Sequence, residues 1–294
     1  MNIEYLLKGL TGLANAPSKS WFYGHFGAVI IAGEFLISEC ELPEEIVPYV
    51  RKHLDKFINS QPELFKELSN DSFEPDWEKK ILGSLEKNLA RLRNSGHGVI
   101  FGTLALKAIR ESEIKVSKSI VDGIVKLLEL TTTDSPDRYF STPDYNKVIV
   151  EPNDSLPPYK NEIDMIRACF SELNVVYDDQ TIDGKTYFFS GCKIHGVTHA
   201  HALCVLDNLG YKDLSRKGFE NHRLQMKLNR HKPPNDEKLT VEKLYCPFNL
   251  DFWNRPLDDT HYIKYPYSAL SLLKKLPKEE QEEYKEKIAL LWSY

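Results

Sequence analysis

Four segments of the sequence share a pattern in which a turn precedes a histidine and an apolar run follows it. The length of these runs and their alanine and glycine content favour a buried helix over a strand. The pattern therefore predicts four buried helices that each carry a histidine near the start. The histidines are His25, His97, His195 and His261, in the segments YGHFGAVIIAGEFL, SGHGVIFGTLALKAI, CKIHGVTHAHALCVLDNLG and DDTHYIKYPYSALSLL.

Amphipathic segments alternate with these apolar ones. In the stretch at 46–60, for example, Val50, Leu54 and Phe57 fall on one stripe of a helix. An apolar helix followed by an amphipathic one predicts a hairpin with an inner and an outer member, and an alternating strand pattern is almost absent. The sequence thus predicts one all-α domain over residues 1–294. The further helices expected lie at 2–14, 76–93, 116–130, 160–173 and 278–292.

An irregular excursion interrupts the helices at residues 131–159. It is rich in proline, aspartate, serine and threonine, and Val148-Ile149-Val150 is the one segment in it that could form a short strand. Irregular segments of this length often act as lids or binding loops, and disorder is the alternative.

Composition limits the classes of function. The formal charge is −5, from 38 basic and 43 acidic residues, which argues against a nucleic-acid partner. Apolar runs such as 27–33 are far shorter than the roughly 20 residues of a membrane-spanning helix, so no membrane span is expected. The N-terminus lacks a basic region, so no signal peptide is expected. The five cysteines are scattered without a C-x-x-C pair, which favours a reducing, cytoplasmic location.

The third apolar segment and its lead-in contain Asp183-Gly184, Phe188 and Gly191, followed by Ala202-Leu203, Leu206 and Leu209. With these residues the segment resembles a repeat of the α/α-toroid proteins, which include terpenoid cyclases, protein prenyltransferase β subunits and lanthionine synthetase cyclases. The resemblance implies helical hairpins arranged as an α/α toroid, in an incomplete or irregular barrel. Asp259-Thr260-His261 is also similar to the D-x-x-H zinc element of prenyltransferases, but is one residue shorter. The contiguous cysteine–histidine zinc motif of lanthionine cyclases is absent, so the resemblance implies an architecture and no set of catalytic residues.

In a toroid the inner helices run parallel, so their N-termini lie at the same end of the barrel. This resemblance implies that His25, His97, His195 and His261 converge there. The partial positive charge of a helix N-terminus disfavours imidazolium. Neutral imidazole is the form that a metal ligand or a general base requires. These four histidines are therefore the candidate catalytic residues.

A metal site is also expected at the start of the third apolar helix. His195 and His199 are four residues apart and share a helix face, whereas His201 points about 160° away from His199. His195, His199, His261 and Asp259 are therefore the candidate ligands, and this donor set favours a transition metal such as zinc or iron. Asp258 and Glu34 are alternative carboxylate partners. His53, His222 and His231 lie on polar faces and are expected to be solvated.

Aromatic residues gather before or at the inner helices, where they could line a cavity or seal the end of the barrel. Tyr23, Phe189, Trp253 and Tyr265 are the candidate substrate-binding residues. The basic stretch 216–232 could hold an anionic substrate or form a solvated helix face.

The favoured function is an enzyme with a histidine-lined, aromatic-walled cavity, acting on a small or extended organic substrate, either a small molecule or a peptide. Metal-assisted and histidine acid–base chemistry both remain open, because no phosphate loop, nucleophile elbow or dinucleotide fingerprint occurs. One alternative is a non-catalytic helical scaffold that binds a peptide or protein partner. Another is an oxygenase acting on an aromatic ketone, because the H-x-x-x-H-x-x-x-L helix from His195 to Leu203 is similar to questin-oxidase-like proteins.

Overall fold

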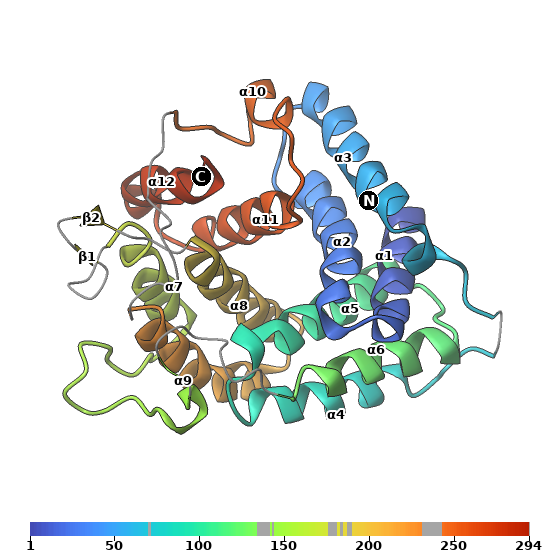
Figure 1. Cartoon of the computed structure of the whole chain (residues 1–294), viewed down its shortest axis with the longest axis horizontal. Helices are drawn as coiled ribbons and strands as arrows, with labels where there is room; N and C mark the ends of the chain where they lie inside the picture. Colours follow the sequence, from blue (N-terminus) through green and yellow to red (C-terminus); the bar gives the residue numbers. More distant parts are fainter. Residues whose placement is uncertain are drawn as a thin grey trace.

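The computed structural model describes residues 1–69, 72–133, 142, 144–175, 181–182, 185–186, 190–230 and 243–293. The regular structure within these residues is helical, apart from a two-residue antiparallel pair formed by β1 (Thr181–Ile182) and β2 (Lys185–Thr186) and an isolated antiparallel bridge between Phe73 and Ser117. The predicted all-α class is therefore confirmed (Figure 1).

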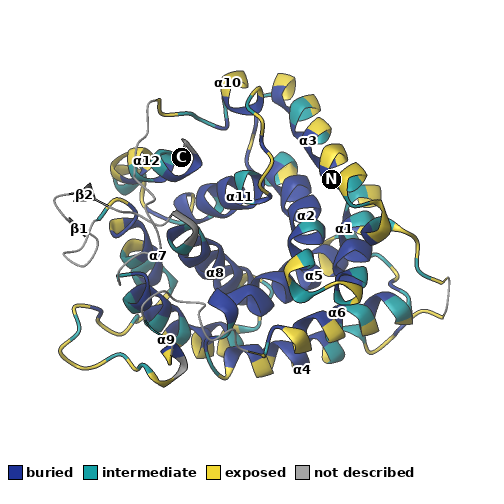
Figure 2. Ribbon diagram, viewed as in Figure 1, coloured by how far each residue is buried: buried dark blue, intermediate teal, exposed yellow. Residues whose placement is uncertain are grey.

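Apolar helices occupy the centre of the molecule, and each packs against the next until the last returns to the first (Figure 1). They are α2 (Gly24–Glu39), α5 (His97–Ser112), α8 (Ser190–Asn208) and α11 (His261–Leu273). Helices α2 and α5 are buried on nearly every side (Figure 2). A helix that is apolar all round is stable only inside a core. The pattern of four apolar segments therefore predicted the buried helices correctly.

The remaining long helices cover this centre with one apolar face each. Helix α1 packs on α2 and α6, α4 on α5, α9 on α8, and α12 on α11. Their outer faces are exposed in Figure 2, as their amphipathic pattern requires. The helices are α1 (Ile3–Asn15), α3 (Val47–Ser60), α4 (Trp77–Leu89), α6 (Lys118–Leu130), α7 (Glu162–Ser171), α9 (Lys212–Leu228), the short α10 (Leu250–Trp253) and α12 (Lys278–Ser293).

Short 3₁₀ turns lead into several of these helices. Two of them, η2 and η5, directly precede α2 and α5 and so place His25 and His97. The turns are η1 (Ala16–Ser18), η2 (Trp21–Tyr23), η3 (Glu44–Ile46), η4 (Pro62–Phe65), η5 (Asn94–Gly96) and η6 (Tyr145–Lys147).

Some predicted boundaries were wrong. Helix α8 begins at Ser190 rather than at His195, so His195 lies more than one turn inside it. Helix α11 begins at His261 and contains Pro266. The chain leaves α8 at Gly210, which has φ 94°, and the N–H of Tyr211 donates to the Leu206 carbonyl at 2.9 Å.

Helix α2 passes the length and composition test for a membrane-spanning segment. Among the described residues it is the one such helix, as the 19-residue stretch Trp21–Glu39, and 67% of its most apolar window is buried in the fold. A central core helix satisfies the same test, so the expected absence of a membrane span stays a prediction.

The described part of the irregular excursion lies against α9. The guanidinium of Arg223 donates to the Leu156 carbonyl at 2.6 Å, and Lys227 donates to the Ile149 carbonyl at 2.9 Å. These cations of the basic stretch therefore hold the chain's own backbone. Residues 148–150 form no strand, so that prediction was wrong, and 134–141 lie outside the described residues.

Helices α1 and α2 approach closely at a glycine contact. A Cβ atom at Gly27 would lie 2.6 Å from the Gly9 carbonyl oxygen and closer still to the Leu13 nitrogen, both of them backbone atoms. Backbone cannot move aside as a side chain can, so only glycine fits at this position.

We expect Gly27→Ala to lower the free energy of unfolding by about 1–3 kcal/mol, as overpacked substitutions do. Gly83 in α4 provides the control, because a methyl group added there would have no atom within 4 Å. Gly83→Ala should raise stability by about 0.5–1 kcal/mol, since alanine is the better helix former. Urea unfolding of both variants checks this contact, and equal stabilities would contradict it.

Candidate functional site

The structure brings together His25, His97, His195 and His261, here called the histidine cluster. The ring centroids of His25 and His97 are 4.7 Å apart, and those of His97 and His195 are 4.5 Å apart. His261 closes the group, with its ring 4.8 Å from His195 and 4.9 Å from His25. His25, His97 and His195 are buried, and His261 is partly exposed. The four predicted histidines therefore share one site at one end of the central helices.

Three members of the cluster could hold a metal ion. One ligand atom each from His25, His195 and His261 lies within 4.8 Å of the others. The Nε2 atoms of His195 and His261 are 3.2 Å apart. Two nitrogens on a tetrahedral zinc ion, with bonds of about 2.0–2.1 Å, would be about 3.3 Å apart. This pair therefore already has the spacing of two ligands on one ion.

A carboxylate fixes the ring of His261. Asp259 Oδ1 lies 2.6 Å from His261 Nδ1 and also accepts the backbone N–H of His261 at 2.8 Å. Burial raises the pKa of the Asp259 carboxyl, but the hydrogen bond and charge of His261 outweigh it and hold the pKa well below its usual range. The ionised carboxylate accepts the Nδ1 proton, so Nε2 faces His195 as an acceptor. Metal-binding histidines commonly have such a partner.

The backbone orients His97 in a similar way. Its Nδ1 donates to the carbonyl of Asn94, in the turn that precedes α5. Asn94 is fixed in turn, because its amide nitrogen donates to the Thr131 and Thr133 carbonyls at 2.8 Å each. The Nε2 side of His97 is therefore the deprotonated side of the ring. Trp21 and Phe101 cover this ring, with centroids at 4.9 and 5.6 Å.

Lys264 is a member of the site that the sequence patterns did not identify. It is 4% exposed, and its Nζ is hydrogen bonded to His25 Nδ1. Burial lowers the pKa of Lys264 to about 7, although the charge of Asp259 opposes this. Burial also lowers the pKa of His25 well below 6.5, assisted by Lys264 and by the other three histidines, so His25 is neutral. A lysine one turn after His261 in an apolar helix was the signal available.

The structure places His199 away from the cluster, so its predicted role as a ligand beside His195 is not supported by the geometry. His199 Nδ1 lies 2.8 Å from Gln225 Oε1, and the Gln225 amide donates to the Ser95 carbonyl at 3.2 Å. Gly96, at φ 79°, packs directly on the His199 ring, so a Cβ atom there would lie 2.7 Å from it. His199 therefore supports the turn that presents His97. His25, rather than His199, joins His195 and His261 as a possible metal ligand.

The alternative carboxylate partners also lie elsewhere. Glu34 is fully buried, but it pairs with Arg51 and accepts the backbone N–H of Asn2. Asp258 pairs with Lys56 at the surface. A buried carboxylate requires a partner, and for Glu34 that partner is an arginine rather than a metal site.

Two of the three histidines expected on solvated faces are buried. His53 is 8% exposed, and its Nε2 donates to the Trp253 carbonyl at 2.8 Å. His222 is 0% exposed, with Tyr159 Oη 3.1 Å from Nδ1 and the Gly196 carbonyl 3.1 Å from Nε2. Tertiary partners cover helix faces that look polar in the sequence, so these two predictions were wrong. His231 lies outside the described residues.

The aromatic residues predicted to bind a substrate do not lie together in one pocket. Tyr265 lines a pocket together with His261. Tyr23 instead stacks on Phe26 with ring centroids 6.0 Å apart. Trp253 lines a different pocket beside α3, and Phe189 lies outside the described residues.

The pocket beside His261 has a volume of about 200 Å³. Asp259 and His261 form its polar side, and Tyr262, Tyr265 and Trp292 supply aromatic walls. The Tyr265 hydroxyl donates to the Ile288 carbonyl at 3.1 Å, and the Trp292 indole N–H donates to the Tyr245 carbonyl at 2.5 Å. Since these polar groups already have partners, the two side chains present apolar ring surface to the pocket.

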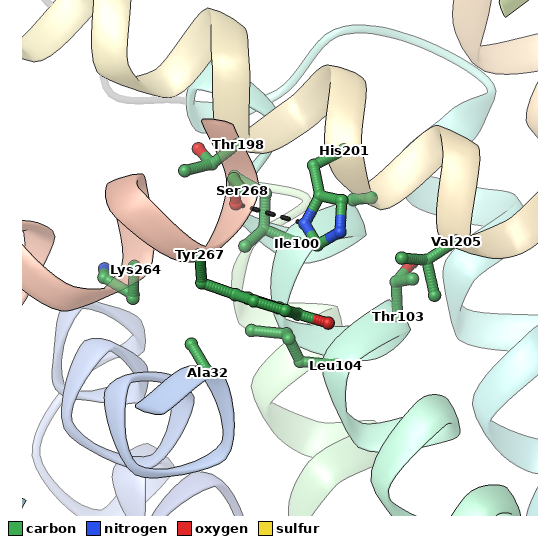
Figure 3. A pocket seen from close by; sticks show the side chains of 11 residues that line it. Ala32, Ile100, Thr103, Leu104, Thr198, His201, Val205, Lys264, Tyr267 and Ser268 are labelled. Carbon is green, nitrogen blue, oxygen red and sulfur yellow. Dashed lines mark hydrogen bonds between the residues drawn. The ribbon is translucent and has the colours of Figure 1, made fainter. Parts of the chain in front are cut away.

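The space between the inner helices is filled. Figure 3 shows Tyr267 lying across it, with His201 hydrogen bonded to Ser268 at 3.1 Å between Nδ1 and Oγ. The void that remains there is about 10 Å³, room for one water molecule at most. The buried His201 and Cys204 thus belong to the core. The space next to the histidine cluster therefore lies at the end of the helices, beside His261.

Comparisons with family models, with curated proteins and with solved structures find no match to this chain. The resemblance to the α/α-toroid proteins and to questin-oxidase-like proteins therefore stays a prediction.

Buried histidines outside the cluster make the stability depend on pH. Burial lowers the pKa of His199 to about 4 and the pKa values of His201 and His222 to about 3. In the unfolded chain these groups titrate near pH 6.5. Below that pH the unfolded state therefore takes up protons that the folded state excludes.

We expect the free energy of unfolding to fall between about pH 6.5 and about pH 4, by up to about 1.4 kcal/mol per pH unit for each of these histidines. Above about pH 7 their contribution should be constant. Urea unfolding across this range measures the slope. His201→Gln should flatten it, and a stability that does not change over this interval would contradict the buried, neutral state.

Proposed function

We propose that this protein is a metal-dependent enzyme, with a zinc or iron ion held by His25, His195 and His261. The observation that carries this proposal is the meeting of three mostly buried imidazoles from three different helices. Side chains from separate helices converge in this way at metal sites of helical bundles. The ring of four inner helices, each packed on the next, is consistent with the proposed α/α toroid.

The ring nitrogens of these histidines are better satisfied by a metal ion than by hydrogen bonds to one another. His25 Nε2 is buried and makes no hydrogen bond to any residue that the structure describes. A buried polar atom without a partner is unfavourable, and a bound cation would supply the partner. Low pKa keeps His25 neutral, as a ligand must be. Imidazole ligands select zinc, iron or copper over magnesium or calcium.

The surrounding residues have separate roles in this proposal. Asp259 holds the ring of His261 so that Nε2 faces His195. Lys264 faces His25 Nδ1. When His25 Nε2 is a ligand, Nδ1 carries the ring proton, so the Lys264 amine must be neutral and accept the hydrogen bond from Nδ1–H. The low pKa of Lys264 allows this at neutral pH. His97, held by Asn94, is the fourth imidazole and is placed to accept a proton from substrate or water.

A bound zinc or iron ion would supply Lewis-acid chemistry or an activated water molecule. The pocket beside His261 limits the substrate to a small molecule or to one side chain of a peptide. Its walls of Tyr262, Tyr265 and Trp292 favour a flat or apolar group. We therefore propose a small aromatic or apolar organic substrate.

The metal proposal is tested on protein purified without a histidine tag. We expect about one equivalent of zinc or iron, or uptake of about one equivalent on reconstitution. Asp259→Asn should weaken metal binding by about 10–100-fold, the usual effect of removing such a partner. His195→Ala and His261→Ala should abolish stoichiometric binding. The matched control is His201→Gln, which removes a buried imidazole outside the cluster and should bind normally.

Less than about a tenth of an equivalent after reconstitution would contradict the metal proposal. Histidine acid–base chemistry would then be the remaining enzymatic function. The chain Asp259–His261–His195, with contacts of 2.6 and 3.2 Å, favours that second candidate because Asp259 stabilises a proton that His261 takes up. A non-catalytic scaffold would instead retain ligand binding in both His195→Ala and His261→Ala.

A further inference from the structure

A second pocket lies between α3 and the segment at the end of α10, and no residue of the histidine cluster lines it. Its volume is about 450 Å³, within the range of about 300–1,000 Å³ that small-molecule sites occupy. One wall is the turn at 253–256 that follows α10. The other wall is a single face of α3, whose residues are spaced by three and four positions: Tyr49, Lys52, His53 and Lys56.

The lining of this pocket is cationic. Lys52, Lys56 and Arg255 contribute three positive charges, and no acidic residue is among the described residues that line it. The whole chain carries a formal charge of −5, so this local excess does not follow from its composition. Convergent cations with a partly apolar wall are the arrangement that binds an organic anion.

The three cations are available to a ligand. Lys52 makes no hydrogen bond or ion pair with any residue that the structure describes. Lys56 pairs with Asp258, but these side chains are 53% and 71% exposed, so the pair is weak and a ligand can replace it. Arg255 donates one bond to the Trp292 carbonyl at 2.8 Å, which leaves other donors of its guanidinium.

Arg255 is also fixed in position before any ligand binds. Its guanidinium carbon lies 4.3 Å from the ring centroid of Tyr245 and 5.1 Å from that of Tyr262. Rings on which a guanidinium packs restrict its rotamers, so less conformational entropy is lost when an anion binds.

The side chain of His53 forms part of the wall of the pocket and is more than nine-tenths buried. Its Nε2 carries the proton, because it donates to the Trp253 carbonyl. Nδ1 is then an acceptor, and it has no hydrogen-bond partner among the described residues. The Nδ1 atom is itself buried, so His53 shapes the wall of the pocket, and the contacts to an anion fall to Lys52, Lys56 and Arg255.

We propose that this cationic pocket binds a small organic phosphate, with the phosphate among the two lysines and Arg255 and the organic part against Tyr49. Phosphate is favoured over a carboxylate because three cations match a dianion. None of the residues that line this pocket is a proposed metal ligand, so either proposal can fail without the other.

Isothermal titration of the full chain with phenyl phosphate tests the proposal. We expect a dissociation constant of about 1 mM or tighter, which weakens as the salt concentration rises. The double variant Lys52→Gln/Lys56→Gln should bind at least about 10-fold more weakly. Lys126→Gln, which removes an exposed lysine from α6, is the matched control and should bind normally. Circular dichroism verifies that each variant is folded.

Undiminished binding by the folded double variant would overturn the proposal, as would the absence of binding to the unaltered chain at about 10 mM phenyl phosphate. Benzoate separates the two kinds of anion. If it binds as tightly as phenyl phosphate, the assignment to a phosphate is wrong. Inorganic phosphate should bind more weakly than phenyl phosphate, because it lacks the group that contacts Tyr49; equal affinities would contradict that contact.

Discussion

The site depends on the removal from water of several basic groups that stand close together. His25, His97 and His195 are buried beside Lys264, and protonation of more than one of these groups would place like charges a few ångströms apart. The fold tolerates the group because burial keeps His25 neutral and lowers the pKa of Lys264 to about 7. Each histidine enters from the first turns of a separate inner helix, so the packing of these four helices on one another fixes the cluster.

Much of the architecture could be predicted because its signals are local. Apolar residues on every side of α2 and α5 can be satisfied only in a core, and a histidine near the start of each such helix predicted the shared site. Tertiary contacts decided what the sequence could not. The four-residue spacing put His199 on the same helix face as His195. In the structure His199 instead contacts Gln225 and packs on Gly96 in the η5 turn. Lys264 was missed because an isolated lysine in an apolar helix does not reveal which group it faces.

The same limit explains the histidines that were expected in solvent. His53 and His222 fall on helix faces that are polar by sequence, and only the placement of Trp253 and Gly196 shows that those faces are covered. Trp253, whose carbonyl accepts from His53, also lines the cationic pocket beside α3. The interior of the helical ring is filled by Tyr267 (Figure 3), so the accessible spaces lie at its end and at its outer surface. One pocket adjoins the histidine cluster, and another, beside α3, is lined by cations.

The proposed role of the imidazoles of His25, His195 and His261 is to hold a metal ion. The most direct test is an anomalous difference map from crystals of the protein reconstituted with zinc, recorded on both sides of the zinc absorption edge. The proposed site predicts one strong peak about 2.0–2.2 Å from nitrogens of His25, His195 and His261. A map without a peak at this position, in which His195 and His261 keep their 3.2 Å Nε2–Nε2 contact, would contradict the metal site.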